Sequence, residues 1–263
     1  CRAGRYTVCE KMLCYGSMVS CAEPPHLFGA YADYLYLPAR AMVHRIGDGI
    51  SPEVGVLIGA VLGNAVRWLS RIGGLKLGMS AAIVGPGQQG MAATVVAAES
   101  GAEPIMVVGL SRDAQRLELC RRFGAHLAIA ADQEDPAEAV RRATRGAGAQ
   151  VVMDVSGHPS GAATALALAG SGAAVVLPGL YGATTQVPLL LDKVVFKELR
   201  LLGAYSQDFE AVEAAITLAR RTKLPLVEMI SHRFPLERAE EAVRLVGGEG
   251  PVTPLKVVLD PSL

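Results

Sequence analysis

The chain has 263 residues, of which 51% are hydrophobic and 19% are charged, and its 25 basic residues balance its 25 acidic ones. This length and apolar content suit one large domain or two smaller ones and exclude a disordered chain. The zero net charge gives no reason to expect a nucleic-acid or membrane-surface partner. We expect a cytoplasmic location, because cysteines are few and no signal peptide is visible.

Residues 1–52 contain aromatic residues and short strand-like runs, such as "GAYADYLYLP" and "AMVHRI". Tyr31, Tyr34 and Tyr36 alternate with other residues in a way that predicts a half-buried strand. The first fifty residues read like the middle of a domain, so we expect the chain to be a fragment of a longer protein. We assign residues 1–52 to a small β-rich lobe.

Residues 53–222 form the predicted central domain, in which short β-branched runs alternate with helical runs between about 80 and 205. Examples are "SAAIVG" followed by "GMAATVVAAESGA", and "PIMVVG" followed by "RDAQRLELCRRFGA". The apolar runs lack polar alternation, which indicates strands buried on both faces. Such repeated units predict an α/β domain with a doubly wound, parallel Rossmann sheet.

Two further segments complete the prediction along the chain. Residues 155–191 lack Asp, Glu, Lys and Arg, but glycines and prolines interrupt them, so we interpret them as buried strands flanking a helix and not as a membrane span. Residues 223–263 read as a strand, the helix "FPLERAEEAVRLV" and a last strand "LKVVLD". We assign them to the same small lobe as residues 1–52.

A glycine-rich turn follows the first predicted strand of the central domain and opens a helix. Its sequence is Gly85-Pro86-Gly87-Gln88-Gln89-Gly90. Gly85 would allow the tight turn, Gly87 would let the backbone approach a pyrophosphate, and Gly90 would let the helix close on the sheet. The helix N-terminus supplies free N–H groups to phosphates. We therefore predict a dinucleotide-binding loop that includes Gln88 and Gln89.

The end of the next strand carries the information about which dinucleotide binds. NAD-specific domains place an acid about twenty residues beyond the last glycine, and Gly109 stands 19 residues after Gly90. Nearby Ser111 and Arg112 are suited to phosphate oxygens, which predicts a preference for NADP over NAD. In the alternative interpretation Arg112 is a solvated helix residue and Asp113 reaches the ribose.

Further cofactor contacts follow from the topology, since ligands of a doubly wound sheet lie beyond the carboxyl ends of its strands. Ser156 follows "VVMDV", and Gly179 with Leu180 follows "AVVLP". We predict that these three residues line the path of the ribose and nicotinamide. The five scattered histidines form no metal motif, so His44 and His232 are expected to be structural, and no catalytic residue is assigned.

Taken together, the chain resembles the medium-chain, zinc-type alcohol dehydrogenases, nearest their threonine and sorbitol dehydrogenase branch. The resemblance is carried by segments including "CRAGRYTVC", "LGNAVRWL", "GPGQQG", "VVMDVSG" and "VFKELRLLGAY". It implies a Rossmann domain between two parts of a GroES-like catalytic lobe, and hydride transfer between NAD(P) and an alcohol or carbonyl. It also implies that Tyr205 and Ser206 lie near the nicotinamide.

The resemblance bears on zinc in two ways. Cys1 and Cys9 match the last two cysteines of the family's four-cysteine structural zinc loop, whereas Cys14 and Cys21 match no family position. The family's catalytic-zinc cysteine and Gly-His-Glu segment would lie before the first residue of this chain. A carboxylate of the family would fall at Ala60, which cannot bind a metal.

These observations predict an NAD(P)-dependent oxidoreductase that interconverts a polyol or secondary alcohol with its carbonyl, present here without its catalytic zinc ligands. A zinc-independent reductase of quinone reductase type and a non-catalytic dinucleotide-binding protein remain alternatives. By resemblance, the segment "VFKELRLLGAYS" is the edge strand through which a homodimer or homotetramer would form. Substrate identity is not predicted.

Overall fold

The computed structural model describes residues 6–10, 14, 18–39, 41–182, 184–250 and 252–263. The chain divides into two compact units, one made of Cys1–Asp48 with Val227–Leu263 and the other of Gly49–Leu226. We call the second one the central unit and the first one the terminal unit. The sequence had placed these two boundaries after residues 52 and 222. The predicted Cys1 zinc ligand lies outside the described residues.

The central unit is built on one six-stranded sheet in which every neighbouring pair is parallel. This confirms the predicted doubly wound α/β fold. The strand order is β3-β2-β1-β4-β5-β6, so the chain winds outward in both directions from β1. The strands are β1 (Ala81–Val84), β2 (Ile105–Gly109), β3 (Leu127–Ala130), β4 (Ala149–Asp154), β5 (Ala169–Leu177) and β6 (Arg200–Gly203).

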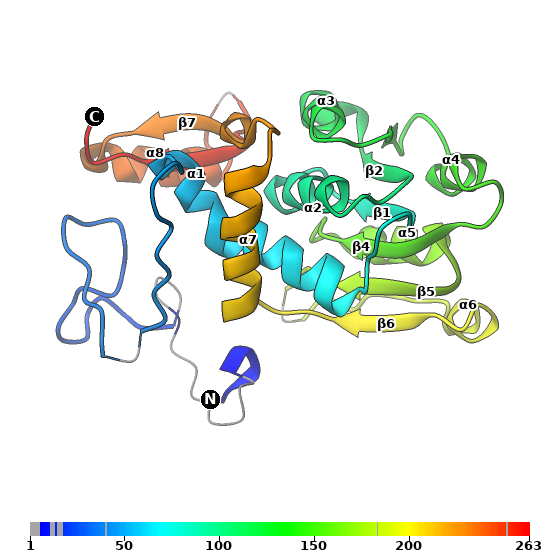
Figure 1. Cartoon of the computed structure of the whole chain (residues 1–263), viewed down its shortest axis with the longest axis horizontal. Coiled ribbons are helices and arrows are strands. Elements are labelled where there is room, and N and C mark those ends of the chain that lie inside the picture. The colour runs from blue at the N-terminus through cyan, green and yellow to red at the C-terminus, as the bar shows by residue number, and fades with distance from the viewer. Residues whose placement is uncertain (1–5, 11–13, 15–17, 40, 183, 251) are drawn as a thin grey trace. The chain divides into compact units, whose positions relative to one another are not determined.

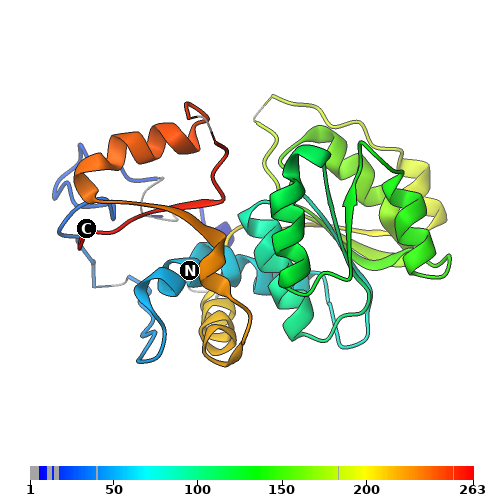
Figure 2. The same ribbon diagram turned by 90° about the horizontal axis from the view of Figure 1, so that it is seen from above.

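Helices cover both faces of this sheet, as the view from above shows (Figure 2). On one face α2 packs against β1 and β2 and contacts α3, and on the other α5 packs against β4 and contacts α4. Strands enclosed in this way are buried along their length, which explains why their sequences are continuously apolar. The helices are α2 (Gln88–Glu99), α3 (Ala114–Arg122), α4 (Pro136–Ala143), α5 (Pro159–Leu168), α6 (Leu191–Phe196) and α7 (Phe209–Arg221).

A long helical segment, Pro52–Ile72, precedes the sheet. It consists of α1 (Pro52–Leu57) and two π-helical stretches, Ile58–Gly63 and Val66–Ile72. In the described chain it is the one segment long and apolar enough to cross a membrane, but 56% of its apolar window is buried within the protein. α2 and α7 pack against it (Figure 1). Its apolar composition is what a helix in the interior of an α/β domain requires.

The terminal unit contains two parallel strands, β7 (Ile230–Phe234) and β8 (Lys256–Leu259), connected through α8 (Ala239–Val246). In its described residues before 49 there is no strand, so the predicted strands around "GAYADYLYLP" and "AMVHRI" are wrong. Tyr31 and Tyr34 are exposed, and the Tyr34 side chain is 78% exposed. An extended segment becomes a strand only when a neighbour pairs with its backbone, and alternation alone does not supply that neighbour.

Candidate functional site

The glycine-rich turn joins β1 to α2 and has the geometry that the sequence predicted. Gly85 has a φ of +100°, a conformation that side-chain-bearing residues rarely adopt. A Cβ atom at Gly90 would collide with the carbonyl oxygen of Gly85, so the first turn of α2 lies directly on the loop. At Gly87, which caps α2, a Cβ would meet no protein atom within 4 Å. The protein's own packing therefore does not explain the glycine at position 87, and the space above it is open.

The end of β4 lies against this turn. A Cβ at Gly85 would stand 2.8 Å from the Cα and the nitrogen of Ser156, the second residue after β4. β1 and β4 are neighbours from which the chain winds in opposite directions. In open α/β sheets, ligands bind beyond the carboxyl ends of two such strands. We call this place the crevice.

A buried carboxylate organises the β4 side of the crevice. Asp154 is completely buried, and its carboxylate accepts hydrogen bonds from the Ser156 N–H (2.9 Å) and the Tyr181 hydroxyl (2.6 Å). Burial, followed by the hydrogen bond to Asp154, raises the pKa of Tyr181. The carboxylate thus ties together the loops after β4 and β5. The sequence reasoning singled out neither Asp154 nor Tyr181, whose polar residue types near strand ends were the one available signal.

The predicted residues on these two loops lie next to each other. A Cβ at Gly179 would be 3.6 Å from the Asp154 carbonyl oxygen and from the Gly157 nitrogen. Leu180 follows with its side chain 79% exposed. Ser156, Gly179 and Leu180 are therefore gathered on one side of the crevice, as expected from their places after β4 and β5.

A second side of the site is formed by the helical segment that contains Ala60 and Asn64. The carbonyl oxygen of Ala60 accepts hydrogen bonds from the side-chain amides of Gln89 and Asn64, both at 2.7 Å. The side-chain carbonyl oxygens of Asn64, Gln88 and Gln89 are buried and have no hydrogen-bond partner in the described structure. An unpaired buried acceptor costs free energy, and all three belong to side chains on or beside the glycine-rich turn. Asn64 was missed from the sequence.

Tyr205 and Ser206 lie on the turn after β6, and the same helical segment holds them. The Ser206 carbonyl accepts a hydrogen bond from the Trp68 indole N–H (2.9 Å), and the Tyr205 carbonyl accepts one from Arg67 (2.9 Å). Ser206 itself has a φ of +60°. These hydrogen bonds connect the turn to the helical segment and not to the glycine loop.

The β2 end forms the third part of the site. A Cβ at Gly109 would lie 2.7 Å from the Pro86 ring, so the glycine loop and the end of β2 are in contact. The Ser111 N–H donates to Asp132 Oδ1 (2.7 Å), and the Ser111 hydroxyl donates to Asp132 Oδ2. These hydrogen bonds lower the pKa of Asp132. Asp132, on the turn after β3, was not considered in the sequence analysis.

Arg112 and Asp113 also lie just after β2, in the region predicted to hold the adenosine ribose, which we call the ribose corner. Their side chains are oriented differently from that of Ser111. The Asp113 carboxylate accepts a hydrogen bond from the Leu110 N–H (3.1 Å) and lies 3.7 Å from Arg116. It therefore caps the start of its own helix, which argues against the alternative in which it reaches the ribose. Arg112 lies exposed in the short helical turn Ser111–Asp113.

Comparison with known proteins agrees with this geometry. The family model for zinc-binding dehydrogenases matches residues 90–221, about half of the chain. A probable alcohol dehydrogenase of Mycobacterium tuberculosis is 38% identical over 99% of the chain and 72% of its own length. The chain belongs to the zinc-binding dehydrogenase family. It is also 31% identical to the L-threonine 3-dehydrogenase of Bacillus licheniformis, over 94% of the chain and 67% of that protein.

A solved structure extends the comparison from sequence to fold. The alcohol dehydrogenase of Thermus sp. ATN1 superposes with a TM-score of 0.85 at 29% identity, over 98% of this chain and 72% of that one. The zinc-type alcohol dehydrogenase resemblance and the Rossmann fold are thus both confirmed. The chain spans about seven tenths of the length of these relatives.

A zinc site would need several His, Cys, Asp or Glu side chains close together. Within the part of the chain that the structure describes, no three His, Cys, Asp or Glu residues come together as metal ligands. Cys9 is half-buried, and Cys14 and Cys21 are exposed. Ala60 uses only its backbone carbonyl, toward Gln89 and Asn64. The described residues therefore do not fit a zinc ion.

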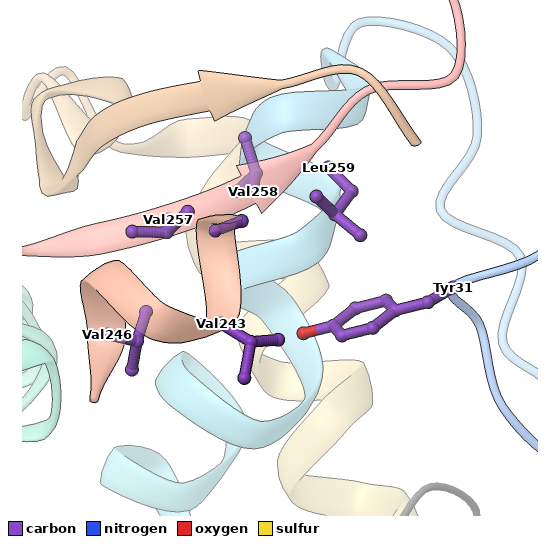
Figure 3. Close-up of a pocket in the computed structure, with 7 residues that line it drawn as sticks. Tyr31, Val243, Val246, Val257, Val258 and Leu259 are labelled. Atoms are coloured by element: carbon purple, nitrogen blue, oxygen red, sulfur yellow. The ribbon is translucent and has the colours of Figure 1, made fainter. Parts of the chain in front are cut away.

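The terminal unit contains a separate apolar cavity of about 270 Å³ between α8 and β8 (Figure 3). The aromatic ring of Tyr31 points toward Val243 on α8 in this view. Apart from the Tyr31 hydroxyl, its walls offer no side-chain donor or charge. The cavity is lined by Tyr31, Ala242, Val243, Val246, Val257, Val258 and Leu259. Among these lining residues, the Tyr31 hydroxyl is therefore the one side-chain group that can form a hydrogen bond with an alcohol.

Proposed function

We propose that the central unit binds NAD(P) and that the protein acts as an oxidoreductase interconverting an alcohol, either a polyol or a secondary alcohol, with its carbonyl compound. The observation that supports this proposal is the geometry of the turn from Gly85 to Gly90. A Cβ atom would collide with protein atoms at Gly85 and Gly90 but would meet open space at Gly87. When bound, the nicotinamide would supply or accept the hydride. The substrate class rests on the alcohol and threonine dehydrogenase relatives.

Each part of the site has a separate task in this proposal. The N-terminus of α2 would bind the pyrophosphate through its free N–H groups. Ser156, Gly179 and Leu180 would line the ribose and nicotinamide path, with Asp154 holding their loops in place. Gln88 and Gln89 begin α2 at this loop and would lie beside the pyrophosphate. Tyr205 and Ser206 would lie at the nicotinamide end.

The first test is binding of NADH and NADPH to the purified chain, measured by calorimetry for the natural chain and for Gly87→Ala. Because a methyl group at position 87 meets no protein atom, the variant should fold normally and bind at least about tenfold more weakly, since the methyl group enters the pyrophosphate space. Gly29→Ala, which also adds a methyl group in open space but in the terminal unit, is the matched control. Unchanged affinity in Gly87→Ala, or no binding by the natural chain, contradicts the proposal.

The second test concerns turnover. Ala60 and the lack of a three-ligand group in the described residues lead us to expect no zinc-dependent alcohol oxidation by this chain alone. Incubation with zinc, either dinucleotide and a panel of polyols and secondary alcohols should give background rates. Zinc-dependent turnover would contradict the expectation, and zinc-independent reduction of quinones would favour the reductase alternative.

We also propose that the protein is cytoplasmic. We further propose that the chain forms a homodimer through the β6 edge of the sheet. β6 is the last strand of the sheet, and among the described strands its one neighbour is β5. Next to it α6 exposes large apolar side chains, of which Phe196 is 86% exposed. An unpaired edge with exposed apolar residues favours association. Light scattering should give the mass of a dimer, and a monomer at tens of micromolar would count against it.

A further inference from the structure

We propose that Asp132, on the turn after β3, is a specificity-determining residue of the dinucleotide site and disfavours the 2′-phosphate of NADP. This inference rests on the proposed binding of NAD(P) by the central unit. In NAD-specific Rossmann domains this task belongs to an acid at the end of the second strand. Here we assign it to a residue that follows the third strand.

The usual position for that acid is closed in this chain. Gly109 ends β2, and a Cβ there would lie 2.7 Å from Cγ of Pro86 and 3.2 Å from Leu117. No carboxylate can therefore stand at position 109 while Pro86 occupies the glycine loop. The same contact shows that the loop for the pyrophosphate adjoins the end of β2, so the adenosine ribose of a dinucleotide bound at the loop would reach this corner.

The fold brings a different carboxylate to the corner. β2 and β3 are neighbours, with Gly109 opposite Ala130, and the Ala131 N–H donates to the Gly109 carbonyl (2.9 Å). Asp132 follows directly and accepts both the N–H and the hydroxyl of Ser111. Two hydrogen bonds from one residue fix the position of the carboxylate, and they keep it ionised by lowering its pKa.

This arrangement changes the role expected for Ser111. Its hydroxyl, which the sequence suggested for a 2′-phosphate, and its N–H both donate hydrogen bonds to Asp132. A phosphate approaching Ser111 would meet a negative charge and would have to displace it, whereas ribose hydroxyls could donate to the same carboxylate. Exposed Arg112 acts in the opposite direction, since its guanidinium attracts a phosphate. The balance between NADP and NAD thus depends on two neighbouring, opposite charges.

The experiment compares dissociation constants for NADPH and NADH, by calorimetry, in the natural chain, Asp132→Asn, Arg112→Ala and Glu134→Gln. Asn keeps an acceptor for the Ser111 N–H and removes the charge. Glu134→Gln removes an equal charge two residues away, from a side chain that pairs with Arg142 (3.0 Å) and does not contact Ser111 in the described structure. We expect Asp132→Asn to raise the ratio of NADPH to NADH affinity about tenfold, the effect of removing one charge close to a phosphate. Arg112→Ala should lower that ratio, and Glu134→Gln should leave it within about twofold, because a screened charge farther away contributes little.

Four results overturn the inference. Asp132→Asn could leave the ratio unchanged, lower it, or change it no more than Glu134→Gln does. In all three cases NADH still binds, so the proposed function survives while the role of Asp132 does not. The fourth result is that neither dinucleotide binds to the natural chain, which refutes the proposed function itself and the inference with it.

Discussion

The two units differ in how their apolar residues are covered. In the central unit Ile83, Phe123 and Met153 are completely buried between sheet and helices. In the terminal unit Tyr34, Leu37 and Met42 are all more than half exposed. Each strand–helix repeat of the central unit brings the next element back onto the sheet. The apolar segments of successive repeats therefore pack against one another. A regular local pattern therefore predicts burial well where successive repeats pack against one another, as they do in the central unit.

The largest expected difference between the units is in thiol reactivity. Burial raises the pKa of Cys120 in α3 to about 12, whereas Cys14 and Cys21 are exposed. Only the thiolate reacts, and a buried thiol reacts only when its surroundings open. Cys120 should therefore be labelled at neutral pH on the order of a thousandfold more slowly than Cys14 and Cys21. Peptide mass spectrometry over a time course measures this, and equal rates would remove the contrast.

The next largest expected difference between the units is the loss of stability when an aromatic side chain is truncated. Phe123→Ala should lower the free energy of unfolding of the central unit by about 3–5 kcal/mol, because a fully buried side chain leaves a cavity. Tyr34→Ala, in the terminal unit, should change it by less than about 0.5 kcal/mol. Urea unfolding followed by fluorescence of Trp68, the one tryptophan of the chain, reports on the central unit. Similar midpoints for both variants would contradict the difference in burial.

A smaller effect is expected where α7 begins. The Asp208 carboxylate accepts the Ala211 N–H (2.9 Å) and pairs with Arg67 (3.1 Å) and Arg71 (2.5 Å). Asp208→Ala removes this cap and should cost about 1–2 kcal/mol of unfolding free energy. Glu210→Ala, an exposed partner of Arg71, should cost nothing measurable. The same urea experiment checks both, and equal effects would show that the cap contributes little.

The smallest effect is a pH dependence that involves Tyr181. Its pKa is raised in the folded protein above the usual value for tyrosine, first by burial and then by Asp154. The unfolded tyrosine ionises at a lower pH than the folded one, so the stability it contributes is present below about pH 10 and declines above it. Tyr181→Phe should have a shallower loss of stability between about pH 9 and about pH 11 than the natural chain. Parallel slopes in the two proteins would show that Tyr181 does not contribute.

The sequence predicted some elements and missed others for identifiable reasons. A glycine soon after a helical run signals the end of a helix, and Gly124 follows α3 by two residues with a φ of +102°. That signal is local, because a positive φ is costly for other residues. The alternation of Tyr31, Tyr34 and Tyr36 is equally local, yet no strand forms there in the described structure. A helix satisfies its own backbone, but a strand depends on a partner elsewhere in the chain.

What the sequence by itself determined is the course of the central fold and its glycine-rich loop, because glycine spacing, apolar runs and helix caps act over a few residues. Only the tertiary structure decided which side chains complete the site. Asp132 meets Ser111 across 21 residues of chain, and Tyr181 meets Asp154 across 27. Such pairs form because parallel strands bring their carboxyl ends to one edge of the sheet. The physical reason is that the order of strands in the sheet, and not distance along the chain, sets which charged groups a ligand meets.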